Sequence, residues 1–217
     1  MRVWTPSDEA KPSLATLRRR WSRSEPRGPS VVSENPIRSV PTSPGAERIN
    51  PFAVEDVIAI LQEKGWLSGG PDEKQAAWCL KAAAILGPQA ADRSRLADLL
   101  RLVFHYDARA ILETTEAHVI MSRYAARDLL RQLALLLLDG AELTTDRFSE
   151  IIATLKQDLD LRGRELFHPL RLTLAGCCGE GELDRVILLL DEAASAGFPV
   201  QVKTARQRIL EFCATLE

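Results

Sequence analysis

Histidine and cysteine are both scarce in this 217-residue sequence, which contains three histidines and four cysteines. No histidine has a second histidine or a cysteine at metal-ligand spacing, so we predict no metal site and no other cofactor. The cysteines are spaced too irregularly for a disulfide framework, which favours a reduced, cytoplasmic location. They are Cys79, Cys177, Cys178 and Cys213.

Long apolar segments are missing as well. The longest uninterrupted run, LALLLL at 133–138, is much shorter than the roughly 20 residues that a membrane-spanning helix needs. No continuous apolar core marks the N-terminus as a secretory signal. We therefore expect a soluble protein with no membrane partner.

Motifs that accompany catalysis are also lacking. The sequence has no glycine-rich phosphate loop of either common spacing and no recognisable Ser–His–Asp arrangement. The adjacent Cys177 and Cys178 do not form a C-x-x-C pair, and we interpret them as small residues packed in a glycine turn. The sequence therefore predicts no catalytic residues and a protein that is not an enzyme.

Positive charge is concentrated in residues 1–50, which hold nine Lys and Arg against five Asp and Glu, a net charge of +4. Residues 51–217 hold nineteen against twenty-five, a net charge of −6. Eight serines and seven prolines among the first fifty residues leave little apolar surface to offset the entropy of ordering. We predict a disordered basic tail over 1–50, followed by an acidic folded domain over 51–217.

The tail contains one local cluster of basic and aromatic residues, LATLRRRWSR at 14–23. Arg18, Arg19 and Arg20 can bind phosphates while the indole of Trp21 stacks on a base, as in proteins that bind single-stranded RNA. The alternative interpretation is a solvated basic tail with no ligand. Sequence alone leaves both interpretations open.

Apolar residues recur at helical spacing throughout the folded domain, and no stretch alternates with a period of two. We predict an all-α helical bundle of about seven to nine helices, with 51–140 and 141–217 as an optional division into subdomains. Asn50 is expected to cap the first helix, with Pro51 at its first position, and the helix over 123–140 is expected to be central and largely buried. The helical segments are 51–64, 71–87, 92–107, 123–140, 144–161, 168–176, 181–197 and 202–216.

The stretch RGRELFHPLRLTLAGCCGEGEL at 162–183 differs from the other helical segments. Pro169 has no amide hydrogen and fits best in the first turn of a helix, so we expect a helix to begin near His168. Four residues that can carry positive charge then gather at its start, where helix amides attract anions. They are Arg162, Arg164, His168 and Arg171.

Two interpretations of this corner remain open. In the first, the basic side chains contact RNA phosphates. In the second, Arg171 pairs with a nearby acid, such as Asp158 or Glu182, and fixes the packing of the helices.

The same stretch resembles the C-terminal, anticodon-binding region of bacterial-type, class I glutamyl-tRNA synthetases. That family has a Pro-Leu-Arg followed by an apolar helix, a glycine, a short turn and a second apolar helix. The resemblance covers about 54–215 and is most specific over 147–190, with Asp191 standing where the family often has glycine. The matching positions are Arg162, Gly163, Leu166, Pro169, Leu170, Arg171, Gly176, Gly181 and Leu183, with the helix that runs to Leu190.

The resemblance implies an all-helical domain that holds the anticodon arm of tRNA. The family's catalytic half has no counterpart here, since no HIGH-type motif or KMSKS-type loop occurs. The hypothesis is therefore a free-standing, non-catalytic protein that binds tRNA. The alternative is a helical interaction module, or a synthetase remnant, that docks on a full-length aminoacyl-tRNA synthetase or another protein and binds no RNA.

Overall fold

The structure, a computed structural model, describes residues 50–216 of the chain. These residues belong to one unit of the chain, Ala46–Glu217. The tail predicted over 1–50, with the candidate RNA-binding residues Arg18, Arg19, Arg20 and Trp21, lies almost wholly outside the described residues. That part of the sequence interpretation stays a prediction.

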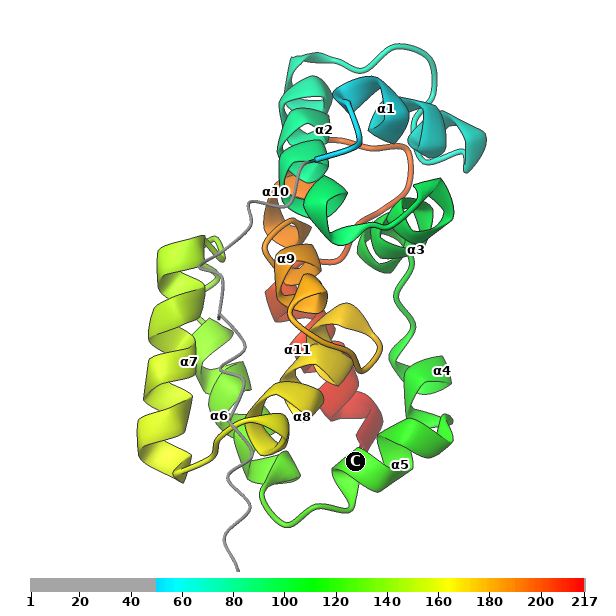
Figure 1. Ribbon diagram of the computed structural model, residues 1–217. Helices are drawn as coiled ribbons and strands as arrows, with labels where there is room; N and C mark the ends of the chain where they lie inside the picture. Colours follow the sequence, from blue (N-terminus) through cyan, green and yellow to red (C-terminus); the bar gives the residue numbers. More distant parts are fainter. Residues whose placement is uncertain (1–49, 217) are drawn as a thin grey trace, which may run out of the picture. The chain divides into compact units, whose positions relative to one another are not determined.

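Helices make up all the regular structure of residues 50–216, which confirms the predicted all-α class (Figure 1). Eleven α-helices are present there, more than the seven to nine expected, because two short helices follow Phe104 and the segment 181–197 is split at Leu188–Leu189. A short 3₁₀ helix, Gly87–Gln89, follows α2. The α-helices are α1 Val54–Glu63, α2 Glu73–Leu86, α3 Arg93–Phe104, α4 Ala108–Leu112, α5 Thr115–Met121, α6 Ala126–Leu137, α7 Thr145–Leu159, α8 Arg164–Ala175, α9 Glu182–Ile187, α10 Leu190–Ser195 and α11 Ala205–Leu216.

The expected cap of the first helix is wrong. The amide nitrogen of the Asn50 side chain donates to the backbone oxygen of Ala83, 3.0 Å away in α2, and so Asn50 anchors the chain to a different helix. Helix α1 begins only at Val54, and the carboxylate of Asp56 accepts a hydrogen bond from the amide of Ala53 at 2.9 Å. Asn50 therefore makes a tertiary contact with α2 instead of capping α1.

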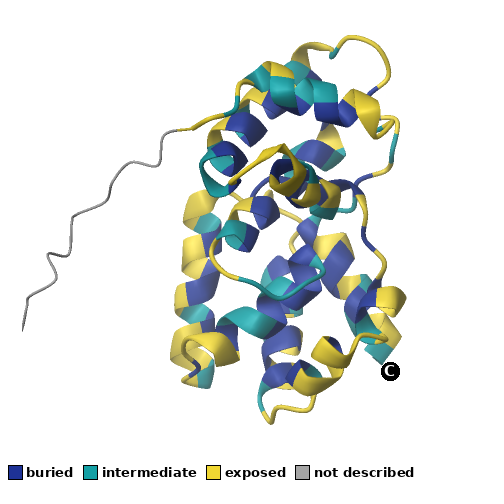
Figure 2. Cartoon of the chain, turned by 45° about the vertical axis from the view of Figure 1, so that its right-hand side comes forward, coloured by how far each residue is buried: buried dark blue, intermediate teal, exposed yellow. Residues whose placement is uncertain are grey.

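Helix α6 is less buried than its apolar sequence suggested. It packs against α7, α8 and α11 through one face, which includes the buried Leu129 and Leu133. On the other side the side chains of Leu135 and Leu138 are 61% and 44% exposed. Figure 2 shows the buried residues on the inward sides of the helices, and α6 follows that ordinary amphipathic pattern.

Four aromatic rings form the core around α2 and α3. The ring of Phe104 stacks on Trp66 with centroids 5.0 Å apart, and it meets Trp78 and Phe198 edge-on at 5.5 and 5.0 Å. The indole nitrogen of Trp78 donates to the carbonyl of Leu189 at 3.1 Å. This cluster joins the N-terminal helices to the segment between α9 and α11.

A fully buried arginine, Arg208 in α11, connects three parts of the fold. Its guanidinium donates to the carbonyl oxygens of Val103 at 2.6 Å and Leu174 at 2.7 Å, in the last turns of α3 and α8, and to that of Lys203 at 3.2 Å. The guanidinium also lies over the ring of Tyr106, 4.6 Å from its centroid. Burial lowers the pKa of Arg208 to about 10, so the group still carries its charge at neutral pH.

Replacing Arg208 with methionine should lower the free energy of unfolding by about 3–5 kcal/mol, since two buried carbonyls, of Val103 and Leu174, and the half-buried carbonyl of Lys203 lose their donor. Urea denaturation followed by circular dichroism measures the change. The matched control is Arg206→Met, two residues earlier on the exposed side of the same helix. Equal stability of the two variants would contradict a structural role for Arg208.

Candidate nucleic-acid interface

Helix α8 begins at Arg164, four residues before the start expected from Pro169. The preceding connection turns sharply, because Asp160 has φ 48° and Gly163 has φ 53°. No side chain caps the helix, and the amide of Phe167 donates to the carbonyl of Gly163 at 3.0 Å. Pro169 therefore lies inside the helix and leaves the carbonyl of Glu165 without its usual helical donor.

A hollow of about 500 Å³ lies along the N-terminal half of α8, and we call it the α8 hollow. Three of the residues predicted from sequence line it: Arg164, His168 and Arg171. Glu116 of α5 and Glu180, in the turn after α8, also line it, so the hollow carries charge of both signs. Arg162 is not among its lining residues.

Arg171 makes packing contacts within the domain. Its guanidinium holds the carboxylate of Asp184 with two hydrogen bonds of 2.7 Å and donates to the carbonyl of Gly179 at 2.8 Å. The Arg171 side chain is only 11% exposed. The packing interpretation thus has direct support, although the acid is Asp184 rather than the expected Asp158 or Glu182. A contact of Arg171 with phosphate stays a prediction.

Phe167 forms an aromatic wall of the α8 hollow, but cations already contact its ring. The Arg171 guanidinium lies 4.8 Å from the ring centroid and the Lys156 ammonium lies 5.7 Å from it. The contact of Lys156 joins α7 to α8, whereas Arg171 and Phe167 belong to the same helix. The ring is also half-buried, so Phe167 offers little surface to a ligand.

His168 is surrounded by positive charge. Desolvation lowers the pKa of its imidazole, and the charges of Arg123, Arg164 and Arg171 lower it further. Glu116 partly opposes the shift. The imidazole is therefore neutral at pH 7, and an anion that enters the α8 hollow will favour its protonation.

Arg162 and Arg164 differ in their surroundings. The Arg162 side chain is 85% exposed and makes a loose ion pair of 3.5 Å with Asp160, which is itself 90% exposed. Arg164 is exposed and has no ion pair within the described residues. Among the predicted residues, Arg164 is thus the side chain best placed to bind a phosphate at the rim of the hollow.

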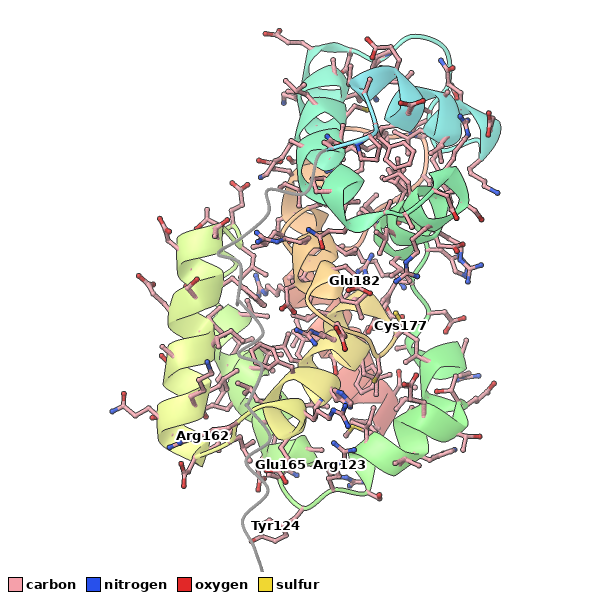
Figure 3. All side chains as sticks on the ribbon, in the orientation of Figure 1. Arg123, Tyr124, Arg162, Glu165, Cys177 and Glu182 are labelled. Carbon is pink, nitrogen blue, oxygen red and sulfur yellow. The ribbon has the colours of Figure 1, made fainter. Side chains whose placement is uncertain are left out.

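Sequence reasoning missed Arg123 and Tyr124, because it assigned both to a helix over 123–140. They lie instead in the connection Ser122–Ala125 between α5 and α6. Figure 3 shows both residues at the same end of the described domain as Arg162 and Glu165. The effect of Arg123 on the His168 pKa places its charge beside the α8 hollow. The sequence does contain a signal for these two residues, because a basic and an aromatic residue stand side by side between two segments with helical apolar spacing.

The two adjacent cysteines lie in the turn that closes α8. Both are half-buried, and the Cys178 thiol lies 3.8 Å from the carbonyl of His168. Burial, aided by Glu116, raises the pKa of Cys178 to about 12, so its thiol stays protonated at neutral pH. Over residues 50–216, no three His, Cys, Asp or Glu side chains gather as a metal site would require, and no helix is long and apolar enough to span a membrane.

Comparison with known sequences identifies the domain. The sequence model of a family described as an anticodon binding domain matches residues 46–192. The chain belongs to this family. The match ends within α10, so α11 and its buried Arg208 lie beyond the matched residues of the anticodon-binding domain.

One similar protein is glutamate–tRNA ligase 2 of Syntrophus aciditrophicus (strain SB), which is 33% identical over 86 residues. The matched residues amount to 40% of this chain and only 16% of the ligase. No solved structure gives a significant match. The expected likeness to the anticodon-binding region of glutamyl-tRNA synthetases is thereby confirmed.

Replacing Arg171 with alanine should lower the free energy of unfolding by roughly 3 kcal/mol, because the largely buried carboxylate of Asp184 loses its partner. Arg162→Ala is the matched control, and we expect no measurable change from its exposed, loose ion pair. Chemical denaturation of the two variants provides the comparison. An Arg171 variant as stable as the wild type would refute the packing role.

We expect His168 to contribute to the decrease in the free energy of unfolding at low pH. Because the folded pKa is lowered, the unfolded chain binds more protons below about pH 6.5, and the free energy of unfolding decreases as pH falls from there towards the folded pKa. His168→Gln should make this decrease smaller. Denaturation at pH 7.5 and 5.5 tests the expectation, with His105→Gln at an exposed position as control. An unchanged decrease in His168→Gln would contradict it.

Proposed function

We propose that this chain binds tRNA through its anticodon-binding domain and carries out no catalytic step of its own. The observation that carries the proposal is the family match over 46–192. The cationic rim of the α8 hollow supports it, and so does the similarity to a glutamate–tRNA ligase. We further propose that the chain acts in the cytoplasm and binds tRNA without a second protein subunit.

The proposed phosphate contacts come from Arg123 and Arg164. Both side chains are exposed, and no carboxylate is paired with either one among the described residues. His168 would add a third positive charge, because a bound phosphate favours the protonated imidazole. Arg171 would act indirectly, by holding the turn that forms one wall of the hollow.

Opposing charge limits the strength of this contact. Glu116 and Glu180 line the same hollow, and residues 51–217 carry a net charge of −6. We therefore expect a modest affinity for tRNA, and this affinity should fall as salt rises because phosphate contacts release counterions. Arg162 and the tail residues Arg18, Arg19, Arg20 and Trp21 remain proposed additional contacts.

A protein partner is the second candidate. It is favoured by the exposed Leu135 on α6, by the exposed Leu138 directly after that helix, and by the acidic character of the domain. In this alternative, the domain docks on a full-length synthetase or another protein and binds no RNA.

Incubation of the purified chain with total cellular tRNA, at low and moderate salt, separates the two candidates. Retention of one isoacceptor group, identified by sequencing and weakened by salt, is the expected result. No retention even at low salt would overturn the tRNA proposal and leave the protein-docking alternative.

Arg164→Ala should reduce the slope of log affinity against log salt by about one, as expected for the loss of one phosphate contact. Lys64→Ala is the matched control, because it removes one exposed positive charge beside α1 rather than at the α8 hollow. A salt titration of tRNA binding gives both slopes. Equal slopes in the two variants would exclude Arg164 as a contact.

A further inference from the structure

Tyr124 has the greatest exposure of any aromatic side chain in the described part of the chain. Its side chain is 99% exposed, whereas the nine other rings of residues 50–216 are buried or half-buried. Those rings belong to Phe52, Trp66, Trp78, Phe104, Tyr106, Phe148, Phe167, Phe198 and Phe212. Among the Phe, Trp and Tyr rings of the described residues, Tyr124 is therefore the one open to a stacked base.

The backbone holds this ring at the tip of a tight turn. The amide of Ala126 donates to the carbonyl of Arg123 at 3.2 Å, which makes Tyr124 the first central residue of a four-residue turn. The Arg123 amide donates to the carbonyl of Ile120 at 3.1 Å, and Ala126 is 2% exposed. Because the turn is anchored on both sides and tyrosine has few rotatable bonds, a ligand that orders the ring pays little entropy.

Basic residues flank the ring in the sequence. Arg123 directly precedes Tyr124, and Arg127 lies three residues after it. Both arginines are exposed. The charges of Arg123 and Arg164 both lower the pKa of His168, which lines the α8 hollow, so Arg123 lies near that hollow. Figure 3 shows Arg123 and Tyr124 at the same end of the domain as Arg162 and Glu165. An aromatic ring beside exposed arginines suits an unpaired nucleotide, because the ring can stack on the base while a guanidinium binds the phosphate.

We propose that Tyr124 is a stacking platform for one unpaired tRNA base, with Arg123 binding the adjacent phosphate. The inference rests on the proposed function and goes further, because it names the residue that receives a base. The base lies against the exposed face of the phenol ring, and the strand then passes along the rim formed by Arg123 and Arg164. Stacking alone makes this contact tolerant of base identity.

The test measures binding of unfractionated tRNA, and of a blunt RNA duplex as comparison, to Tyr124→Ala and Tyr124→Phe. We expect Tyr124→Ala to weaken tRNA binding by about 5- to 150-fold, the loss of one stacked base, while duplex binding and the salt slope stay unchanged. Tyr124→Phe keeps the ring and should bind tRNA like the wild type. Arg123→Ala should instead lower the salt slope by about one.

Leu80→Ala, which truncates a 62% exposed side chain on α2, is the matched control and should leave tRNA binding unchanged. Thermal melts check folding, and the full exposure of Tyr124 predicts an unchanged midpoint for Tyr124→Ala. Wild-type affinity in Tyr124→Ala, or equal losses in Tyr124→Ala and Tyr124→Phe, would overturn the stacking inference while tRNA binding stands. A wild-type chain that binds no tRNA would overturn both proposals.

Discussion

The buried guanidinium of Arg208 is the contact on which the described domain depends most. It places a positive charge against the C-terminal carbonyls of α3 and α8, where the dipoles of both helices are negative. Since these carbonyls have no helical donors, one side chain satisfies groups in two helices that are far apart in sequence. Helix α11 is thereby fixed against the rest of the domain, although the family match ends before it.

Arginines serve two different purposes in this domain. Arg208 and Arg171 have their donors occupied by carbonyls and a carboxylate, so they define the positions of α8, α9 and α11. Arg123 and Arg164 are exposed, and neither has an ion pair within residues 50–216. Arg208 and Arg171 therefore stabilise the packing of the helices, whereas Arg123 and Arg164 place positive charge on the surface.

The sequence predicted most helices because their apolar stripes are regular, as in α3 and α7. Its errors have physical causes: Asn50 bonds to α2 instead of capping α1, and Pro169 is tolerated inside α8. Arg164, His168 and Arg171 are spaced as neighbours on one helix face, so sequence alone could group them. Arg123, Tyr124 and Glu116 join them only through tertiary packing, and the short α4 and α5 carry too few apolar residues for a stripe.

Pro169 divides α8 into two segments of unequal stability. The first turn has lost one backbone hydrogen bond, at the carbonyl of Glu165, and no side chain caps it. The second part is held by Arg171, by Arg208 and by the left-handed Gly176 that ends the helix. The first turn of α8 is thus held mainly by side-chain packing, because Leu166 is fully buried there, while Arg164 in the same turn stays exposed to a ligand.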